Sequence, residues 1–382
     1  RCTPRRGVQS NVIDTGGRGV TMPQVYPIKT ALAAACWLLM AVCLPSGDAG
    51  AEETFRCTGT RRLMGVPWTI TLHAASAEQG EEALAAAFAE VHRLETILSD
   101  YDPTSELSRL SATAPHAQPQ AVGADLWQVL TRAVEIRDAT GGVFDPTVGP
   151  LTTLWRQARR SGEMPRPEKL LQARGAVGPG LLRLFPETKA VKLVNPGMRL
   201  DLGGIGMGFT IDRTLDLLRL RGVESAMIDA SGDIGVSAAP PHATGWKIAV
   251  APLDPAAGTA PETLLLAGAA ITTSGDAHQG VEIAGRRFSH IVDPRTGLGV
   301  EGFSAVTVIA PDATTADALA TAASVLGPVA GMASIAATPG CSGRWVWREH
   351  GKLCESRSPG WPGPFSPADD PLPTDPAAPS RD

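Results

Sequence analysis

Short β-like runs recur through the second half of this sequence, and they constrain its fold more than any other feature. Beyond Leu181, runs rich in Val, Ile, Thr and aromatic residues follow one another with only two helix-like stretches between them. A chain in which every strand alternated with a helix would instead form a parallel α/β sheet. We therefore expect a single α+β domain. The runs predict strands at Trp68–Leu72, Ala190–Val194, Ala226–Ile228, Trp246–Val250, Thr263–Leu266, Phe288–Val292 and Ala305–Ile309.

Amphipathic spacing predicts helices in both halves of the chain. In Glu81–Leu98 an apolar residue recurs every three or four positions, as on the buried face of a helix. A loop that ends in the capping residues Thr104 and Ser105 leads into a short helix. The other predicted helices are Asp125–Ala139, Ile211–Leu220 and Thr315–Leu326.

Charge and size exclude several classes of function. The chain has 382 residues, enough for a sizeable core, and a formal net charge of -5. A nucleic-acid-binding protein would carry a surplus of basic residues to neutralise phosphates, and an anionic membrane surface would also attract a basic patch. We expect neither nucleic acid nor a polybasic membrane contact.

The two ends of the sequence differ in composition from its middle. From Met22, a lysine precedes an apolar run from Ala31 to Leu44, and an A-x-A site follows at Ala49 to Ala51. These are the three parts of a secretory signal peptide, and the run is shorter than the ~20 residues of a membrane span. We therefore predict a doubtful upstream extension at 1–21, a signal peptide at 22–51, and an exported, periplasmic protein, with membrane association left open. Eight prolines in 358–382 predict a disordered tail.

Removal of the signal peptide would leave three of the six cysteines, namely Cys57, Cys341 and Cys354. The last two flank a segment that would form a hairpin, and an exported protein would allow a disulfide between them. The sequence alone leaves this bond open.

A glycine-rich loop, "DLGGIGMGFTID" from Asp201 to Asp212, precedes a predicted helix. Its glycines do not have the Rossmann spacing, and there is no Walker A lysine. What remains is an aspartate, a glycine turn and a helix N-terminus, whose free N–H groups favour an anion. A purely structural turn would also explain the loop.

Two further motifs carry groups with possible chemistry. Asp317 and Thr321 are four residues apart, so on a helix they share one face and offer hard oxygen ligands that suit Mg²⁺. Helix capping by Thr314 or Thr315, with Asp317 near the positive helix end, would explain the same residues. His290 lies near the end of a predicted strand, where an imidazole could accept a proton at neutral pH.

Together, and in this order, the motifs resemble those of the ApbE family, the FAD:protein FMN transferases. The resemblance runs from about Leu63 to Gly351 and implies one T-fold-related α+β domain with mixed or antiparallel sheets and packed helices, at 55–352. The matching blocks are LMGVPWTI, SDYDPTSELSRL, TGGVFDPTVGPL, LDLGGIGMGFTIDR, DASGDI, TSGD, SHIVDPRTG and TADALATAASVLG.

The resemblance implies an Mg²⁺-dependent enzyme that splits FAD and attaches FMN through a phosphoester to a Thr or Ser of a partner redox protein, with release of AMP. It assigns the role of general base to His290, which Asp293 could orient. It assigns the metal ligands to the main-chain carbonyl of Gly204, to Asp317 and to Thr321. It assigns contacts with FAD to Met64, Tyr101, Val143, Phe144, Asp145, Asp201 and Val292.

Met207 departs from the family pattern, which usually has a lysine at this position of the loop. Met207 cannot supply that charge, which Arg213 or Arg295 would have to replace, or the affinity for FAD would be lower. Two alternative functions stay open at this point. One is an FAD pyrophosphatase that gives FMN and AMP, and the other is a non-catalytic periplasmic flavin-binding protein.

Overall fold

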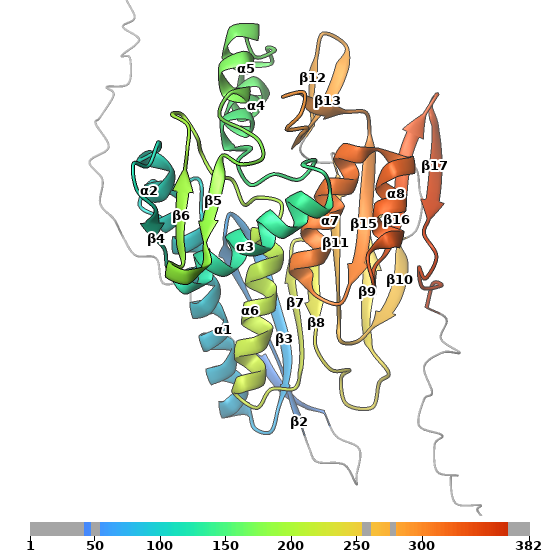
Figure 1. The fold of residues 1–382 in the computed structure, drawn as a ribbon. Coiled ribbons are helices and arrows are strands. Elements are labelled where there is room, and N and C mark those ends of the chain that lie inside the picture. The colour runs from blue at the N-terminus through green and yellow to red at the C-terminus, as the bar shows by residue number, and fades with distance from the viewer. Residues whose placement is uncertain (1–41, 47–53, 254–260, 276–279, 366–382) are drawn as a thin grey trace, which may run out of the picture. The chain divides into compact units, whose positions relative to one another are not determined.

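A nine-stranded antiparallel sheet organises the protein (Figure 1). The structure is a computed structural model that describes residues 42–46, 54–253, 261–275 and 280–365. The strand order is β1-β2-β3-β7-β8-β11-β15-β16-β17, and each neighbouring pair is antiparallel. The strands are β1 Val42–Ser46, β2 Thr54–Leu63, β3 Val66–Ala74, β7 Ser225–Ala230, β8 Asp233–Val236, β11 Ala269–Gly275, β15 Ser304–Ala310, β16 Ser342–Glu349 and β17 Lys352–Arg357. The predicted α+β class is confirmed.

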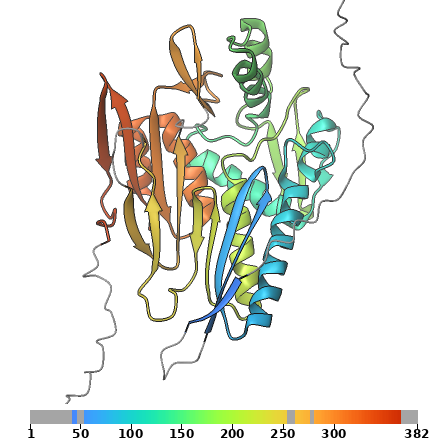
Figure 2. The ribbon, with the colours of Figure 1, turned by 180° about the vertical axis from the view of Figure 1, so that it is seen from behind.

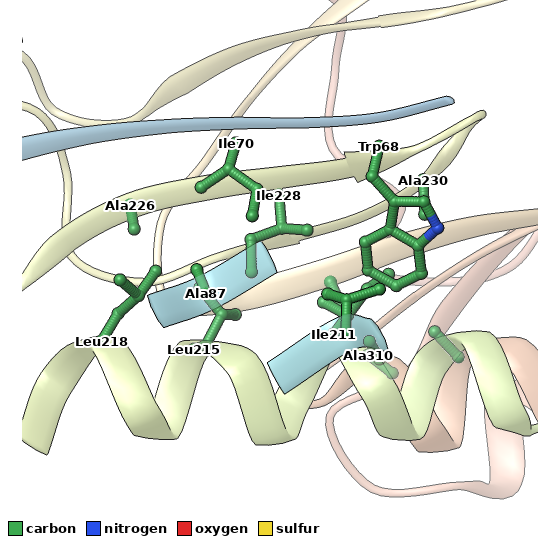
Figure 3. Close-up of a cluster of buried hydrophobic side chains, with 14 of the residues drawn as sticks. Trp68, Ile70, Ala87, Ile211, Leu215, Leu218, Ala226, Ile228, Ala230 and Ala310 are labelled. Carbon is green, nitrogen blue, oxygen red and sulfur yellow. The ribbon is translucent and has the colours of Figure 1, made fainter. Parts of the chain in front are cut away.

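Helices cover one face of this sheet. Figure 3 shows Trp68, Ile70 and Ile228 of the strands pointing toward α6. Helix α6 contributes Ile211, Leu215 and Leu218 to the same core. Burial of this apolar surface is the main force that holds the helices on the sheet. None of the helices in the described ranges is long and apolar enough to cross a membrane. The helices are α1 Ala77–Leu98, α2 Glu106–Ala112, α3 Ala124–Ala139, α4 Gly149–Ser161, α5 Pro167–Arg174, α6 Gly206–Leu220, α7 Ala313–Leu326 and α8 Pro328–Ala337, with a 3-10 turn η1 at Pro186–Thr188.

The opposite face of the sheet carries the hairpin of β9 (Trp246–Val250) and β10 (Glu262–Leu266), seen in yellow and gold in Figure 2. Because side chains alternate along a strand, Ile271 of β11 faces this hairpin while its neighbour Ala270 faces the helices. The central strands are therefore buried on both faces.

Two smaller sheets lie beside the main one. The first pairs β4 (Gln120–Ala121), β6 (Ala190–Leu193) and β5 (Leu182–Phe185) and shares a core with α3. The second pairs β12 (Val281–Ile283), β13 (Arg286–Val292) and β14 (Gly299–Glu301). A separate core joins this second sheet to α4 and α5, which stand next to it in Figure 1.

Trp155 of α4 fixes the contact with the second small sheet. Its ring lies 5.1 Å from that of Phe288, and its Nε1 donates to the carbonyl of Gly297 at 2.9 Å. This contact places α4 against β13, the strand that carries His290.

Two helix starts differ from the predicted ones. Helix α6 begins at Gly206, because the last glycines of the loop already have helical geometry. Helix α7 is not capped by Thr314 or Thr315, which lie inside it. Its N-cap is Asp312, whose carboxylate accepts from the Thr315 N–H at 2.7 Å, and Asp212 accepts from the N–H groups of Ala313 and Thr314. A carboxylate outcompetes a hydroxyl at this positive helix end.

The described strands extend beyond the predicted limits of the domain, 55–352, at both ends. Strand β17 continues to Arg357, beyond the expected boundary at 352. The first eight residues of the predicted disordered tail lie in the described structure, where the Phe365 N–H donates to the carbonyl of Thr263 at 2.7 Å and the Lys247 Nζ lies 4.8 Å from the centre of the Phe365 ring. The rest of the tail and most of the predicted signal peptide lie outside the described residues, but β1 falls within the peptide and pairs with β2.

Cys341 and Cys354 are free thiols. The hairpin register explains why. Cys354 pairs with Trp347, six residues along from Cys341, which is a separation of about 20 Å on an extended strand. A disulfide needs Cα atoms within about 7 Å. The hairpin is therefore held by its ladder and not by a bridge between these two residues.

Candidate active site

The glycine loop packs backbone to backbone against α7. None of Gly203, Gly204, Gly206 and Gly208 has a positive φ, so the loop needs no left-handed turn, and Gly204 and Gly208 instead permit a close approach of the backbone. A Cβ on Gly208 would lie 2.1 Å from the carbonyl oxygen of Ala313, and one on Gly204 would lie 2.8 Å from Thr321 Oγ1. The loop is thus built to hold a second helix against itself.

This packing brings together the three groups predicted to bind a metal. Asp317 Oδ2 accepts from the N–H of Gly208 at 3.1 Å, and Gly204 lies against the Thr321 side chain. The Thr321 hydroxyl also lies 3.3 Å from the Ser274 hydroxyl at the end of β11. A carboxylate, a hydroxyl and a peptide carbonyl, drawn from segments a hundred residues apart, therefore share one location.

Electrostatics at Asp317 favour a cation. The side chain is buried, and burial together with the nearby Asp233 and Asp212 carboxylates raises the pKa of Asp317 well above its usual range. A divalent ion beside it would reverse this cost by stabilising the ionised form. No group of three or more His, Cys, Asp or Glu side chains in the described segments could hold a metal. The Asp317 carboxylate, the Thr321 hydroxyl and a peptide carbonyl are hard oxygen donors, which fit an ion such as Mg²⁺ that would take its remaining ligands from water or a substrate phosphate.

His290 lies on β13 between Phe288 and Val292, whose side chains pack against α4, and it is close enough to Asp201 at the start of the loop to interact with it electrostatically. Burial and the neighbouring Arg159 guanidinium lower the pKa of His290 to about 4, although Asp201 opposes this change. Its Nδ1 is enclosed and lacks a hydrogen-bond partner among the described residues. The imidazole is therefore neutral at physiological pH.

Asp201 is the residue that links His290 to the loop. Its Oδ1 accepts from the Gly203 N–H at 2.8 Å and so forms the turn at the start of the loop. Its Oδ2 accepts from the Thr152 hydroxyl at 2.6 Å and from Arg156 at 2.9 Å. Asp201 is thus fixed by the loop on one side and by α4 on the other.

Tyr101 and Met64 lie near the C-terminal end of α1. The Tyr101 ring is 73% exposed, and the guanidinium of Arg156 lies 4.2 Å from its centroid. Met64 has a left-handed backbone in the β2–β3 turn, and its N–H donates to Glu95 of α1 at 2.8 Å. The structure therefore brings Tyr101, Asp201 and His290 around Arg156, while Met64 is tied to α1.

The other predicted FAD contacts are buried. Val143 and Phe144 belong to the core beneath α3, and Val292 belongs to the core between α4 and β13. Asp145 accepts from Thr147 through Oδ1, while its enclosed Oδ2 lacks a partner among the described residues, and burial raises its pKa. The side chains of Val143, Phe144 and Val292 lie in these cores and not beside Arg156. Their contact with FAD therefore stays a prediction, and it would have to be made by their main-chain atoms.

The charges expected to replace a lysine at position 207 are engaged elsewhere. Arg213 lies 3.4 Å from Asp125, and Arg295 pairs with Asp293 at 2.9 Å. That second pair also occupies the carboxylate that was expected to orient His290. Met207 itself is half-buried against the main core.

Sequence reasoning missed the arginines of α4. Leu151, Trp155 and Ala158 have the i, i+4, i+7 spacing of a helix face, and Thr152, Arg156 and Arg159 repeat it one position later. That doubled pattern is the signal that could have revealed α4 as a helix with one apolar and one basic face.

Known proteins share this fold. The structure superposes on the apo flavinyl transferase ApbE of Pseudomonas stutzeri with a TM-score of 0.71 and 27% identity, over 80% of this chain and 95% of that one. It superposes on the flavin transferase ApbE of Vibrio cholerae with a TM-score of 0.71 and 26% identity, over 80% and 98%. A curated FAD:protein FMN transferase of Haemophilus influenzae is 30% identical over 259 residues, which are 66% of this chain and 74% of that protein. The chain is an enzyme of the transferase class.

Its family follows from a direct match. The model of the ApbE family matches residues 64–344, which include every candidate site residue named above. The chain belongs to the ApbE family.

Proposed function

We propose that the protein is a Mg²⁺-dependent FAD:protein FMN transferase that modifies a Thr or Ser of a partner redox protein. The observation that supports this proposal is that one glycine loop has neighbours of both kinds: Asp201, at its start, lies near His290, while Gly204 and Gly208 pack against Thr321 and Asp317. The names of the related proteins support the same activity.

The reaction exchanges one P–O bond for another. The acceptor hydroxyl oxygen forms a bond to the phosphorus of the FMN half, the bond from that phosphorus to the bridging oxygen breaks, and this oxygen leaves with AMP. Nε2 of His290 takes the hydroxyl proton, since Nδ1 is enclosed. When bound, Mg²⁺ would offset the charge that develops on the leaving phosphate.

Each of the chain's own residues has a defined task in this scheme. Asp317, Thr321 and the Gly204 carbonyl would hold the ion, and Asp201 shapes the loop that joins them to His290. Burial and the positive charge of Arg159 lower the pKa of His290 and so keep its imidazole in the neutral form, which is the form that can accept a proton. Tyr101 offers an exposed aromatic face to a planar flavin ring.

Labelling of an acceptor tests the proposal. The protein is incubated with FAD, Mg²⁺ and an acceptor that another family member flavinylates, and covalent flavin is detected by in-gel fluorescence. His290→Ala should abolish labelling and keep FAD binding. The control His350→Asn should label normally, because His350 lies in the exposed β16–β17 turn, where its positive φ is one that Asn tolerates. AMP release without any acceptor would indicate a pyrophosphatase, and tight FAD binding without AMP would indicate a carrier.

We also propose that the protein is exported, on the basis of residues 22–51. Cleavage after this segment would remove β1 and leave β2 as the edge of the sheet. N-terminal sequencing of the protein secreted by its host would test this, and an intact segment on the purified protein would contradict it.

A further inference from the structure

One guanidinium connects three residues of the candidate flavin site. Arg156 donates to Asp201 at 2.9 Å and to Asp100, and it covers the Tyr101 ring at 4.2 Å. Its side chain is 20% exposed, and those of Asp100 and Asp201 are 8% and 5% exposed. We propose that Arg156 is a positioning residue of this site: it holds the Tyr101 ring and the Asp201 carboxylate in one fixed arrangement on which the isoalloxazine ring binds. This inference rests on the proposed function.

The geometry requires an arginine. A guanidinium is planar, so its edge can donate to two carboxylates while its face covers an aromatic ring. A lysine has the same charge but one small head group, which cannot make all three contacts at once. The residues 100 and 101 are adjacent, so the pairing with Asp100 also sets where the Tyr101 backbone lies.

The charges around Arg156 explain why it is fixed. Asp100 and Asp201 both face it, and burial together with Asp201 raises the pKa of Asp100 even though Arg156 opposes this. Arg199 is 4.0 Å from Asp100, and Arg159 and His290 face the Asp201 side. Loss of Arg156 alone would leave two carboxylates close together in a poorly solvated place, so the single variant Arg156→Met risks unfolding.

The experiment therefore uses a charge-balanced variant. Asp100→Asn combined with Arg156→Met removes one buried charge of each sign and should preserve the thermal unfolding temperature. Arg156→Lys keeps the charge without the planar contacts. Arg160→Met, on the exposed side of the same helix, is the matched control. Each full-length variant is compared by equilibrium FAD binding, by quenching of the bound flavin's fluorescence, and by the KM for FAD and kcat of acceptor labelling.

If Arg156 positions the site, the double variant and Arg156→Lys fold normally but bind FAD about tenfold more weakly, as expected for the loss of charge-assisted contacts. Their bound flavin is less quenched, the change appears mainly in KM, and Arg160→Met matches the wild type. Wild-type affinity and quenching in the double variant would show that Arg156 only neutralises buried charge, which would overturn the inference. Failure of the wild type itself to bind FAD or to label would instead refute the proposed function.

Discussion

Gly208 provides the sharpest test of how the loop holds the site together. A Cβ at this position would lie 2.1 Å from the carbonyl oxygen of Ala313 and 2.8 Å from the N–H nitrogen of Thr314. Ordinary carbon–oxygen contacts are about 3.3 Å, so Gly208→Ala must move α6 and α7 apart by about 1 Å. Neither contact atom is a flexible side-chain end, because both belong to the backbone of the first turn of α7.

The expected effect of Gly208→Ala on the free energy of unfolding has two parts, a loss and a smaller gain. Overpacking of this kind costs about 1–3 kcal/mol of the free energy of unfolding, against a gain of up to about 1 kcal/mol from the better helix propensity of alanine. Each kcal/mol corresponds to about 2–4 °C in the unfolding temperature of a domain this large. The same movement would separate Gly204 from Thr321 and Gly208 from Asp317, and misplacement by about 1 Å can cost a hundredfold in rate.

Gly206→Ala is the matched control. Its Cβ would meet only Leu202, at an ordinary 3.7 Å, although it lies in the same turn of α6. Thermal unfolding and Mg²⁺-dependent acceptor labelling are measured for both variants. We expect Gly206→Ala to match the wild type and Gly208→Ala to unfold earlier and to need more Mg²⁺. If Gly208→Ala has normal stability and a normal Mg²⁺ dependence, the backbone contact between the two helices does not organise the site.

Three further predictions concern charge. Burial and Arg159 lower the pKa of His290 from 6.5 to about 4, so the pH profile of kcat/KM should show no loss of activity near pH 6.5 from this group. The stability that neutral His290 contributes should be lost only as the pH falls from 6.5 toward 4. A midpoint of acceptor labelling near pH 6.5 would contradict this prediction. Met207→Lys should bind FAD more tightly at low salt and lose that gain at high salt, since its half-buried stem can keep the ammonium in water; equal affinity at both salt concentrations would show that the charge is irrelevant. Asp317→Asn should abolish labelling yet unfold no earlier than the wild type, because it removes a carboxylate whose pKa burial raises; retained labelling would exclude Asp317 as a metal ligand.

Local patterns in the sequence predicted part of this structure well. Helix α1 was expected at Glu81–Leu98 and spans Ala77–Leu98, because its apolar stripe is long and regular. The i, i+4 spacing of Asp317 and Thr321 correctly placed both on one helix. In each case a period of 3.6 residues carries the information, and nothing distant is needed.

The rest depends on contacts between distant segments. Arg156 pairs with residues 45 and 56 positions away, and no local pattern encodes such a pairing. The pKa of His290 could only be expected near 6.5 from its residue type, whereas burial and Arg159 of another element lower it. Likewise, the sequence left open whether the glycine loop favours an anion or forms only a structural turn, and it could not show that α7 is what approaches Gly204 and Gly208 most closely.

The two ends of the glycine loop lie in opposite electrostatic surroundings. Asp201, at its start, contacts Arg156 and lies near His290, while Gly208, seven residues later, donates to Asp317 among other carboxylates. If the two surroundings were exchanged, carboxylates near His290 would raise its pKa and favour the protonated form, which cannot act as a base. Arginines near Asp317 would satisfy its charge and leave no electrostatic need for a cation. The separation of charge along this loop would therefore allow one short segment to serve the proposed neutral base and the proposed cation site at the same time.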